Sequence, residues 1–170
     1  MSEYEVFRPK LNKPCHLAER KEARAAYNWF IESIPERIKG LKDFVNECGY
    51  PVLEGRDFLP VLNDFGVCSE IVGHEKLGPL ELSLAIDINM YIGDLLVQKF
   101  DNLHWVFHTF GKSDVNYQCP VIMGFSKIRN KKYSIEFFRI IAGYGIRILE
   151  GEPKEDGLFI RLYDYQAKKA

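Results

Sequence analysis

The segment that most constrains the fold is residues 80–100, the longest apolar stretch of the chain. Its apolar side chains recur at three- and four-residue steps and define a wide face of an α-helix, formed by Leu84, Ile88, Tyr91, Ile92, Leu95 and Leu96. Polar residues interrupt the stretch at Asp87, Asn89 and Asp94, so it lacks the roughly 18 consecutive apolar residues that a membrane span needs. We therefore expect a helix at the centre of a core and no membrane segment.

Further helices are expected on both sides of this segment, over residues 17–33, 35–48, 57–66 and 134–143. Pro35 suits the first position of a new helix, so it predicts a break between the first two. Ser134 suits the N-cap of the last, and Gly143 and Gly145 are interpreted as its stop. Residues 158–165 fit a strand or a helix, and the helix is favoured.

Two segments after the central helix have the composition of strands. Residues 103–110 and 119–125 are rich in aromatic and β-branched side chains, and a short polar connection between them favours antiparallel pairing. Residues 1–16 hold two prolines and little periodicity, which predicts an irregular arm before one globular domain over 17–170. The expected fold class is α+β, a mostly helical single domain with a two-stranded antiparallel hairpin packed on the central helix.

Composition and the first residues favour a soluble globular protein. The chain has 170 residues, of which 46% are hydrophobic and 28% charged, so a sizeable core is possible at this length. The start, MSEYEVFRPK, has no apolar signal-peptide core, and a cytoplasmic location is expected.

Four cysteines, Cys15, Cys48, Cys68 and Cys119, are scattered along the chain. No two of them form a C-x-x-C pair, and none lies with a histidine at zinc-finger spacing, so neither a structural zinc site nor a redox dithiol is indicated. Free buried thiols are the favoured interpretation, and two disulfides are the alternative.

The common catalytic and nucleotide-binding signatures are missing from the sequence. There is no P-loop, no H-E-x-x-H, no G-x-S-x-G and no EF-hand loop, and no cofactor is expected. The basic run at 126–132, SKIRNKK, is interpreted as a solvated turn, because a sequence pI near 6.4 lacks the basic footprint of a nucleic-acid binder.

Polar residues of the central helix form one narrow stripe, comprising Ser83, Asp87, Asp94 and Gln98. A stripe of this kind usually faces solvent. The alternative is that Asp87 and Asp94 form a carboxylate site of a small enzyme or metal-binding protein, joined by His108 from the neighbouring strand. A metal held by His104, His108 and Asp114 is disfavoured, because residues four apart on a strand are about 13 Å apart.

The segments LSLAIDINMYIGDLL, LHW and DVNYQCPVIMGF within residues 82–125 resemble a family of uncharacterised bacterial proteins associated with immunity proteins of polymorphic toxin systems. The recurring marks are a helix with Asp87, Tyr91, Gly93 and Asp94, a strand with Trp105, and a strand over 120–125. These marks belong to the fold, so the resemblance carries over no functional residue. It implies a stoichiometric binder that blocks a toxin.

Charge along the chain suits such a binder, because the net charge of −1 conceals an acidic centre of −6 over residues 51–110. The predicted function is a non-catalytic interaction protein, an immunity or inhibitor protein that neutralises a basic toxin domain through an acidic surface. The expected partner-binding residues are Asp64, Glu70, Glu75, Asp87, Asp94 and Asp101.

Overall fold

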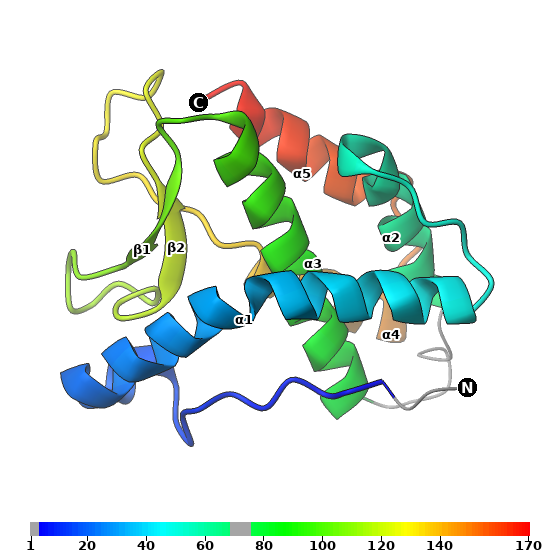
Figure 1. Cartoon of the computed structure of the whole chain (residues 1–170), viewed down its shortest axis with the longest axis horizontal. Coiled ribbons are helices and arrows are strands. Elements are labelled where there is room, and N and C mark those ends of the chain that lie inside the picture. The colour runs from blue at the N-terminus through cyan, green and yellow to red at the C-terminus, as the bar shows by residue number, and fades with distance from the viewer. Residues whose placement is uncertain (1–3, 69–75) are drawn as a thin grey trace.

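The computed structural model describes residues 4–68 and 76–170, and it has the predicted α+β fold, made mostly of helix (Figure 1). The helices are α1 (Arg20–Glu47), α2 (Phe58–Cys68), α3 (Pro79–Lys99), α4 (Phe138–Leu149) and α5 (Leu158–Ala167). Strands β1 (His104–Phe107) and β2 (Pro120–Met123) form one antiparallel hairpin. Short 3-10 turns at Cys15–Leu17 and Gly55–Asp57 precede α1 and α2.

Helix α3 lies at the centre of the core, as predicted. It packs against α1, α2, α4 and α5, and Figure 1 shows α1 crossing it. Its start is fixed by Pro79 in the first turn and by the Gly78 N–H, which donates to Glu81 Oε2 at 2.8 Å. Most of its side chains are buried on all sides, which explains why its sequence is apolar nearly all round.

Helix α1 is continuous from Arg20 to Glu47, and the predicted break at Pro35 is wrong. Its buried side chains follow the 3.6-residue period, with Phe30, Ile34 and Leu41 facing the core. Pro35 is exposed, so the carbonyl that loses its hydrogen bond to the proline can be solvated by water. Helical packing on both sides of the proline therefore outweighs its local cost.

The hairpin is shorter than the predicted segments but pairs as expected, with Trp105 opposite Ile122 and Phe107 opposite Pro120. It packs on α3 at Gly93, where an added Cβ would lie 2.3 Å from the Trp105 ring. A side chain at position 93 would therefore push the hairpin away from the central helix.

Helix α4 begins at Phe138, four residues after the predicted start, so the N-cap assignment of Ser134 is wrong. Ile135 exchanges backbone hydrogen bonds with Ile122 at 2.9 and 3.1 Å, which keeps the chain extended beside β2. The helix also continues through Gly143 and Gly145, because its apolar face remains packed beyond them. The two glycines do not stop it.

The last helix, α5, confirms the favoured interpretation of residues 158–165. Its buried face carries Leu158, Phe159 and Tyr163. On its exposed side, Asp164 forms an ion pair of 2.6 Å with Arg56, which lies in the 3-10 turn before α2. Within the described ranges, no helix is long and apolar enough to cross a membrane.

Candidate functional site

Asp87 was expected on a solvent-facing stripe, but its side chain is fully buried between α1 and α3. The Arg37 guanidinium contacts both carboxylate oxygens, with Nε 2.9 Å from Oδ1 and the terminal Nη2 2.6 Å from Oδ2. Burial raises the pKa of Asp87, whereas the hydrogen bonds from Arg37 and Tyr4 oppose that shift. Asp87 is therefore a structural ion-pair residue, which removes it from the predicted partner surface and from the predicted carboxylate site.

The same ion pair holds the N-terminal arm. The Tyr4 hydroxyl donates to Asp87, and the Phe7 N–H donates to Ser83 Oγ at 2.7 Å. Arg37 also donates to the Glu5 carbonyl at 2.7 Å. These contacts fix residues 4–7 across the start of α3, as the trace below α1 shows in Figure 1. We call them the N-terminal anchor of the arm.

Among the described residues, no contact joins the remaining predicted partner acids Asp64, Asp94 and Asp101 to one another. Asp64 on α2 and Asp101 after α3 are exposed, while Asp94 is half-buried and accepts a hydrogen bond from Gln98 at 2.6 Å. Burial raises the pKa of Asp94. Glu70 and Glu75 lie outside the described residues.

His104 and His108, the two histidines of the hairpin region, do not join these described acids. His108 is buried just after β1, with Nε2 3.2 Å from Asp114 Oδ2, and His104 is exposed near the other end of the strand. Within the part of the chain that the structure describes, no cluster of three His, Cys, Asp or Glu side chains is placed to hold a metal. The pairing of His108 with Asp114 steadies the turn between the strands.

A second anchor holds the other end of the arm. The Gln118 side-chain amide donates to the carbonyls of Cys15 at 3.1 Å and Ala18 at 2.9 Å. Gln118 is buried and adopts a positive φ of 64°, a conformation that non-glycine residues rarely take. The unfavourable backbone conformation of Gln118 therefore accompanies the two hydrogen bonds that its side chain makes to the arm.

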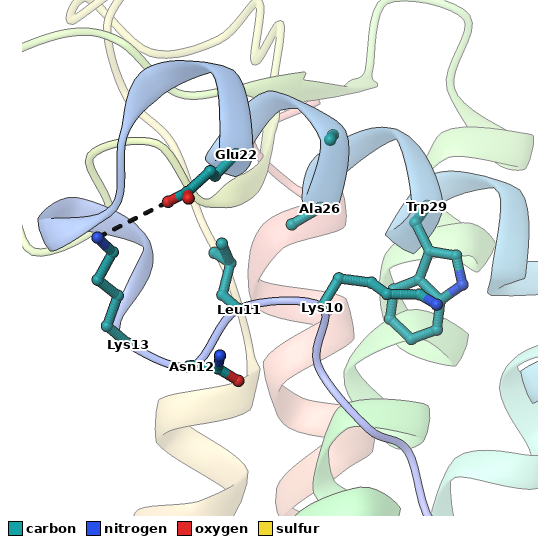
Figure 2. A pocket seen from close by; sticks show the side chains of 8 residues that line it. Lys10, Leu11, Asn12, Lys13, Glu22, Ala26 and Trp29 are labelled. Carbon is teal, nitrogen blue, oxygen red and sulfur yellow. Dashed lines mark ion pairs between the residues drawn. The ribbon is translucent and has the colours of Figure 1, made fainter.

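Between the two anchors, residues 8–14 run over α1, and two pockets lie between this segment and the helix. We call these residues the strap. Figure 2 shows the side chains that line a first pocket at the strap, with Lys10 beside Trp29 and Lys13 facing Glu22. The pocket has a volume of about 580 Å³, and the Lys13–Glu22 ion pair is 3.7 Å long. A second cavity of about 700 Å³ shares Lys10, Leu11 and Trp29 with the first and extends toward α3 and β2. We call this larger cavity the strap pocket.

The strap pocket is lined mainly by apolar and aromatic side chains from every neighbouring element, among them Phe7, Tyr27, Phe30, Ile86, Pro120 and Phe138. Helix α1 presents Ala23 and Ala26 here, and their small side chains leave the hollow unfilled. A cavity with this lining and volume is typical of a small-molecule site.

A few polar groups also reach the strap pocket. Asn89 is buried on α3 and accepts from the Phe137 N–H at 2.8 Å, which leaves its side-chain nitrogen for a ligand. Glu136 lies before α4, with Oε1 3.7 Å from the Arg139 guanidinium. Burial raises the pKa of Glu136, and Arg139 opposes that shift. Arg139 also donates to Asn116 at 2.6 Å and is held against the 111–117 turn.

Cys15 and Cys119 both line the strap pocket, and both are half-buried. A hydrogen bond with the Cys119 thiol lowers the pKa of Cys15 to about 7, and the Arg139 charge acts in the same direction. The same hydrogen bond raises the pKa of Cys119. The lowered pKa favours the thiolate of Cys15, the form that reacts as a nucleophile.

Comparisons with protein-family models, curated proteins and solved structures find no match. Function is therefore inferred from the geometry of the chain.

Sequence reasoning missed the strap pocket and its thiol pair. Cys15 and Cys119 lie far apart in sequence, and the contact depends on Gln118 reaching the arm. Two local signals were present in the sequence. Pro9 and Pro14 indicate a stiff, extended segment, and the alanines of α1 indicate a helix face with little side-chain bulk beneath it. The expectation of buried thiols also fails for Cys48, which is exposed after α1, and the Cys68 side chain lies outside the described part.

Proposed function

We propose that this chain is a non-catalytic binding protein that holds an apolar small molecule in the strap pocket. The observation that supports the proposal most directly is the cavity itself, about 700 Å³ between the strap, α1, α3 and the start of β2. Small-molecule sites have volumes of about 300–1,000 Å³, apolar linings and a few polar groups that orient the ligand. All three features occur together here.

The lining indicates the class of ligand. Tyr27, Phe30 and Phe138 offer ring surfaces suited to a flat or aromatic body. Asn89 supplies an amide donor, and Glu136, whose pKa is raised by burial, can both donate and accept when protonated. The expected ligand has an apolar body and one hydroxyl, amine or amide group, because the mostly apolar lining would leave a larger polar surface desolvated without partners.

Titration with the neutral apolar dye N-phenylnaphthylamine tests this proposal. The dye is expected to bind with a stoichiometry of one and to quench the fluorescence of Trp29, which lines the pocket. Ala26 also lines it and is half-buried, so Ala26→Phe should fill the space and weaken binding by about tenfold, or about 1.4 kcal/mol.

Asn28→Phe is the matched control, because Asn28 is exposed on the same helix and does not line the pocket. This variant should bind the dye as the unmodified chain does. Equal loss of binding in both variants, or dye binding that Ala26→Phe leaves unchanged, would refute the pocket as the site.

A second candidate function is the inhibition of a protein partner, as immunity proteins inhibit toxins. The observation that favours it is the charge of −6 over residues 51–110, with Asp64 and Asp101 exposed. Burial raises the pKa of Tyr91 to about 12, and the charges of Glu54 and Asp94 contribute, so both acids lie near Tyr91. An acidic surface of this kind would steer a basic toxin domain into contact.

Coexpression with a toxin domain encoded beside this chain tests the second candidate. Rescue of growth and a stoichiometric complex are expected. Replacing Asp64, Asp94 and Asp101 together by asparagine should slow association, most strongly at low salt. The same number of changes at exposed acids outside the centre, Glu32, Glu36 and Glu150, provides the control. Failure of rescue would refute this candidate and leave the dye experiment unaffected.

A further inference from the structure

We propose that Cys15 and Cys119 form a reversible disulfide, which fastens the strap to β2 and closes the strap pocket. The two residues line the same cavity, and each thiol shifts the pKa of the other, which agrees with side chains that lie close together. The Gln118 side chain holds the Cys15 carbonyl at 3.1 Å, so the residue next to Cys119 already ties the two segments together. The crosslink stands on this geometry, and only its role in closing a ligand site rests on the proposed function.

The chemistry requires an oxidant, and a low-molecular-weight disulfide such as glutathione disulfide is sufficient. The Cys15 thiolate attacks one sulfur of that disulfide, its S–S bond breaks, and one glutathione thiolate leaves. Cys119 then loses its proton and attacks Cys15 Sγ in the mixed disulfide, which releases the second glutathione. The protein gives up two electrons and two protons, and the glutathione disulfide becomes two thiols. A reducing glutathione pool reverses both steps.

The two cysteines are suited to different roles in this exchange. Cys15 has the more acidic thiol, so it is the attacking group, and it lies half-exposed at the end of the strap where an oxidant can reach it. Cys119 retains its proton until the mixed disulfide forms, and it is therefore the resolving group. Labile disulfides of this accessible kind serve redox sensing in reducing compartments.

The consequence for the strap follows from the unequal strength of its two anchors. The N-terminal anchor includes the buried Arg37–Asp87 pair, whereas the other end is held by the two hydrogen bonds from Gln118 and by apolar packing around Ala18, without an ion pair of this kind among the described contacts. Opening of the strap should therefore begin at its Cys15 end. A covalent bond there restricts this movement and changes the pocket lining only at the two cysteines.

A chain carrying Cys48→Ser and Cys68→Ser, with Cys15 and Cys119 as its remaining cysteines, is the protein to test. After equilibration with glutathione disulfide, intact mass should fall by two hydrogen atoms, and digestion should yield the Cys15–Cys119 crosslinked peptide. Amide hydrogen exchange over residues 8–17 should slow on oxidation and recover on reduction, while exchange in α5 stays unchanged. Bound N-phenylnaphthylamine should dissociate more slowly from the oxidised chain.

Each outcome bears on a distinct part of the proposal. Persistent glutathione adducts without the crosslinked peptide would overturn the disulfide. A crosslink that leaves exchange over residues 8–17 unchanged would overturn closure of the strap. The further change Cys119→Ser should leave Cys15 as a glutathione adduct, and slower exchange in that variant would also contradict closure by the crosslink. If the dye fails to bind the reduced chain, the ligand site is refuted, while the mass and exchange results still decide the crosslink.

Discussion

The guanidinium of Arg37 on α1 donates two hydrogen bonds, 2.9 and 2.6 Å long, to the fully buried carboxylate of Asp87 on α3. The pair lies where α1 crosses the central helix, and Tyr4 of the arm completes the cluster by donating to the same carboxylate. Three segments of the chain therefore depend on one charge pair. A pair of this kind is costly to break, because the remaining charge stays buried without its partner.

Asp87→Asn and Arg37→Ala should each lower the free energy of unfolding by about 3–5 kcal/mol. The loss should match that of Ile92→Ala, a large-to-small change in the core that costs about 2–5 kcal/mol. Urea unfolding followed by circular dichroism measures all three variants.

The double variant Arg37→Met with Asp87→Leu provides the control for this prediction. Replacing both charges by apolar side chains removes the unpaired charge and should recover a large part of the lost stability. A loss at Asp87→Asn of less than about 1 kcal/mol would contradict the buried pair and restore the solvent-facing interpretation.

Substitution by alanine at Gly93 and at Gly40 should change the stability of the protein in opposite directions. An added Cβ at Gly93 would collide with the Trp105 ring, so Gly93→Ala should destabilise the protein by about 1–3 kcal/mol. Gly40 lies in the middle of α1 with nothing within 4 Å of such a Cβ, so Gly40→Ala should stabilise it by about 0.5–1 kcal/mol. Thermal unfolding separates the two, and a stabilising Gly93→Ala would show that the hairpin packs elsewhere.

The polar stripe of α3 illustrates what the sequence predicted and what it did not. The helix and its central position followed from the apolar period, and both are confirmed. The stripe itself is real, but α1 and the arm cover its first half, so Ser83 and Asp87 are buried while Gln98 at the other end is exposed. Local periodicity shows which residues share a face, and only the packing of distant segments decides what covers that face.

The strap pocket was unpredictable for the same physical reason. Its walls come from the arm, α1, α3 and the start of β2, and its two anchors join Tyr4 to Asp87 and Cys15 to Gln118. None of these contacts is close in sequence. Spacing rules for cysteine sites detect ligands within one turn or loop, and they are silent on a pair that two remote segments bring together.

Pro35 offers a direct test of the continuous helix α1. The proline is exposed and lacks the N–H that would bond to the preceding turn, so Pro35→Ala should restore that hydrogen bond. Stability should rise by about 1–3 kcal/mol, since proline is about 3 kcal/mol less favourable than alanine inside a helix. Hydrogen exchange of the amides around residue 35 should slow in parallel. A fall in stability would indicate that the proline itself is needed for packing against α3.

Glu136 should lower the stability of the protein as the pH rises, whereas the ion-paired Asp164 should raise it. Burial raises its pKa above the ordinary 4.5, so the folded chain binds the proton more tightly than the unfolded chain does. Its contribution to stability is therefore fully present below pH 4.5 and is lost as the pH rises through the pKa of the folded state. Asp164 behaves in the reverse way, because its hydrogen bond with Arg56 lowers its pKa.

The measurement is the free energy of unfolding of Glu136→Gln minus that of the unmodified chain, taken from acid to neutral pH. Glutamine keeps the hydrogen-bonding shape without the charge, so this difference should grow as the pH rises, in favour of the variant. Asp164→Asn is the comparison: its deficit should be absent in acid and appear above the ordinary value of 3.8. A Glu136→Gln difference that stays flat with pH, or shrinks, would show that the carboxyl is solvated and not part of a buried pocket wall.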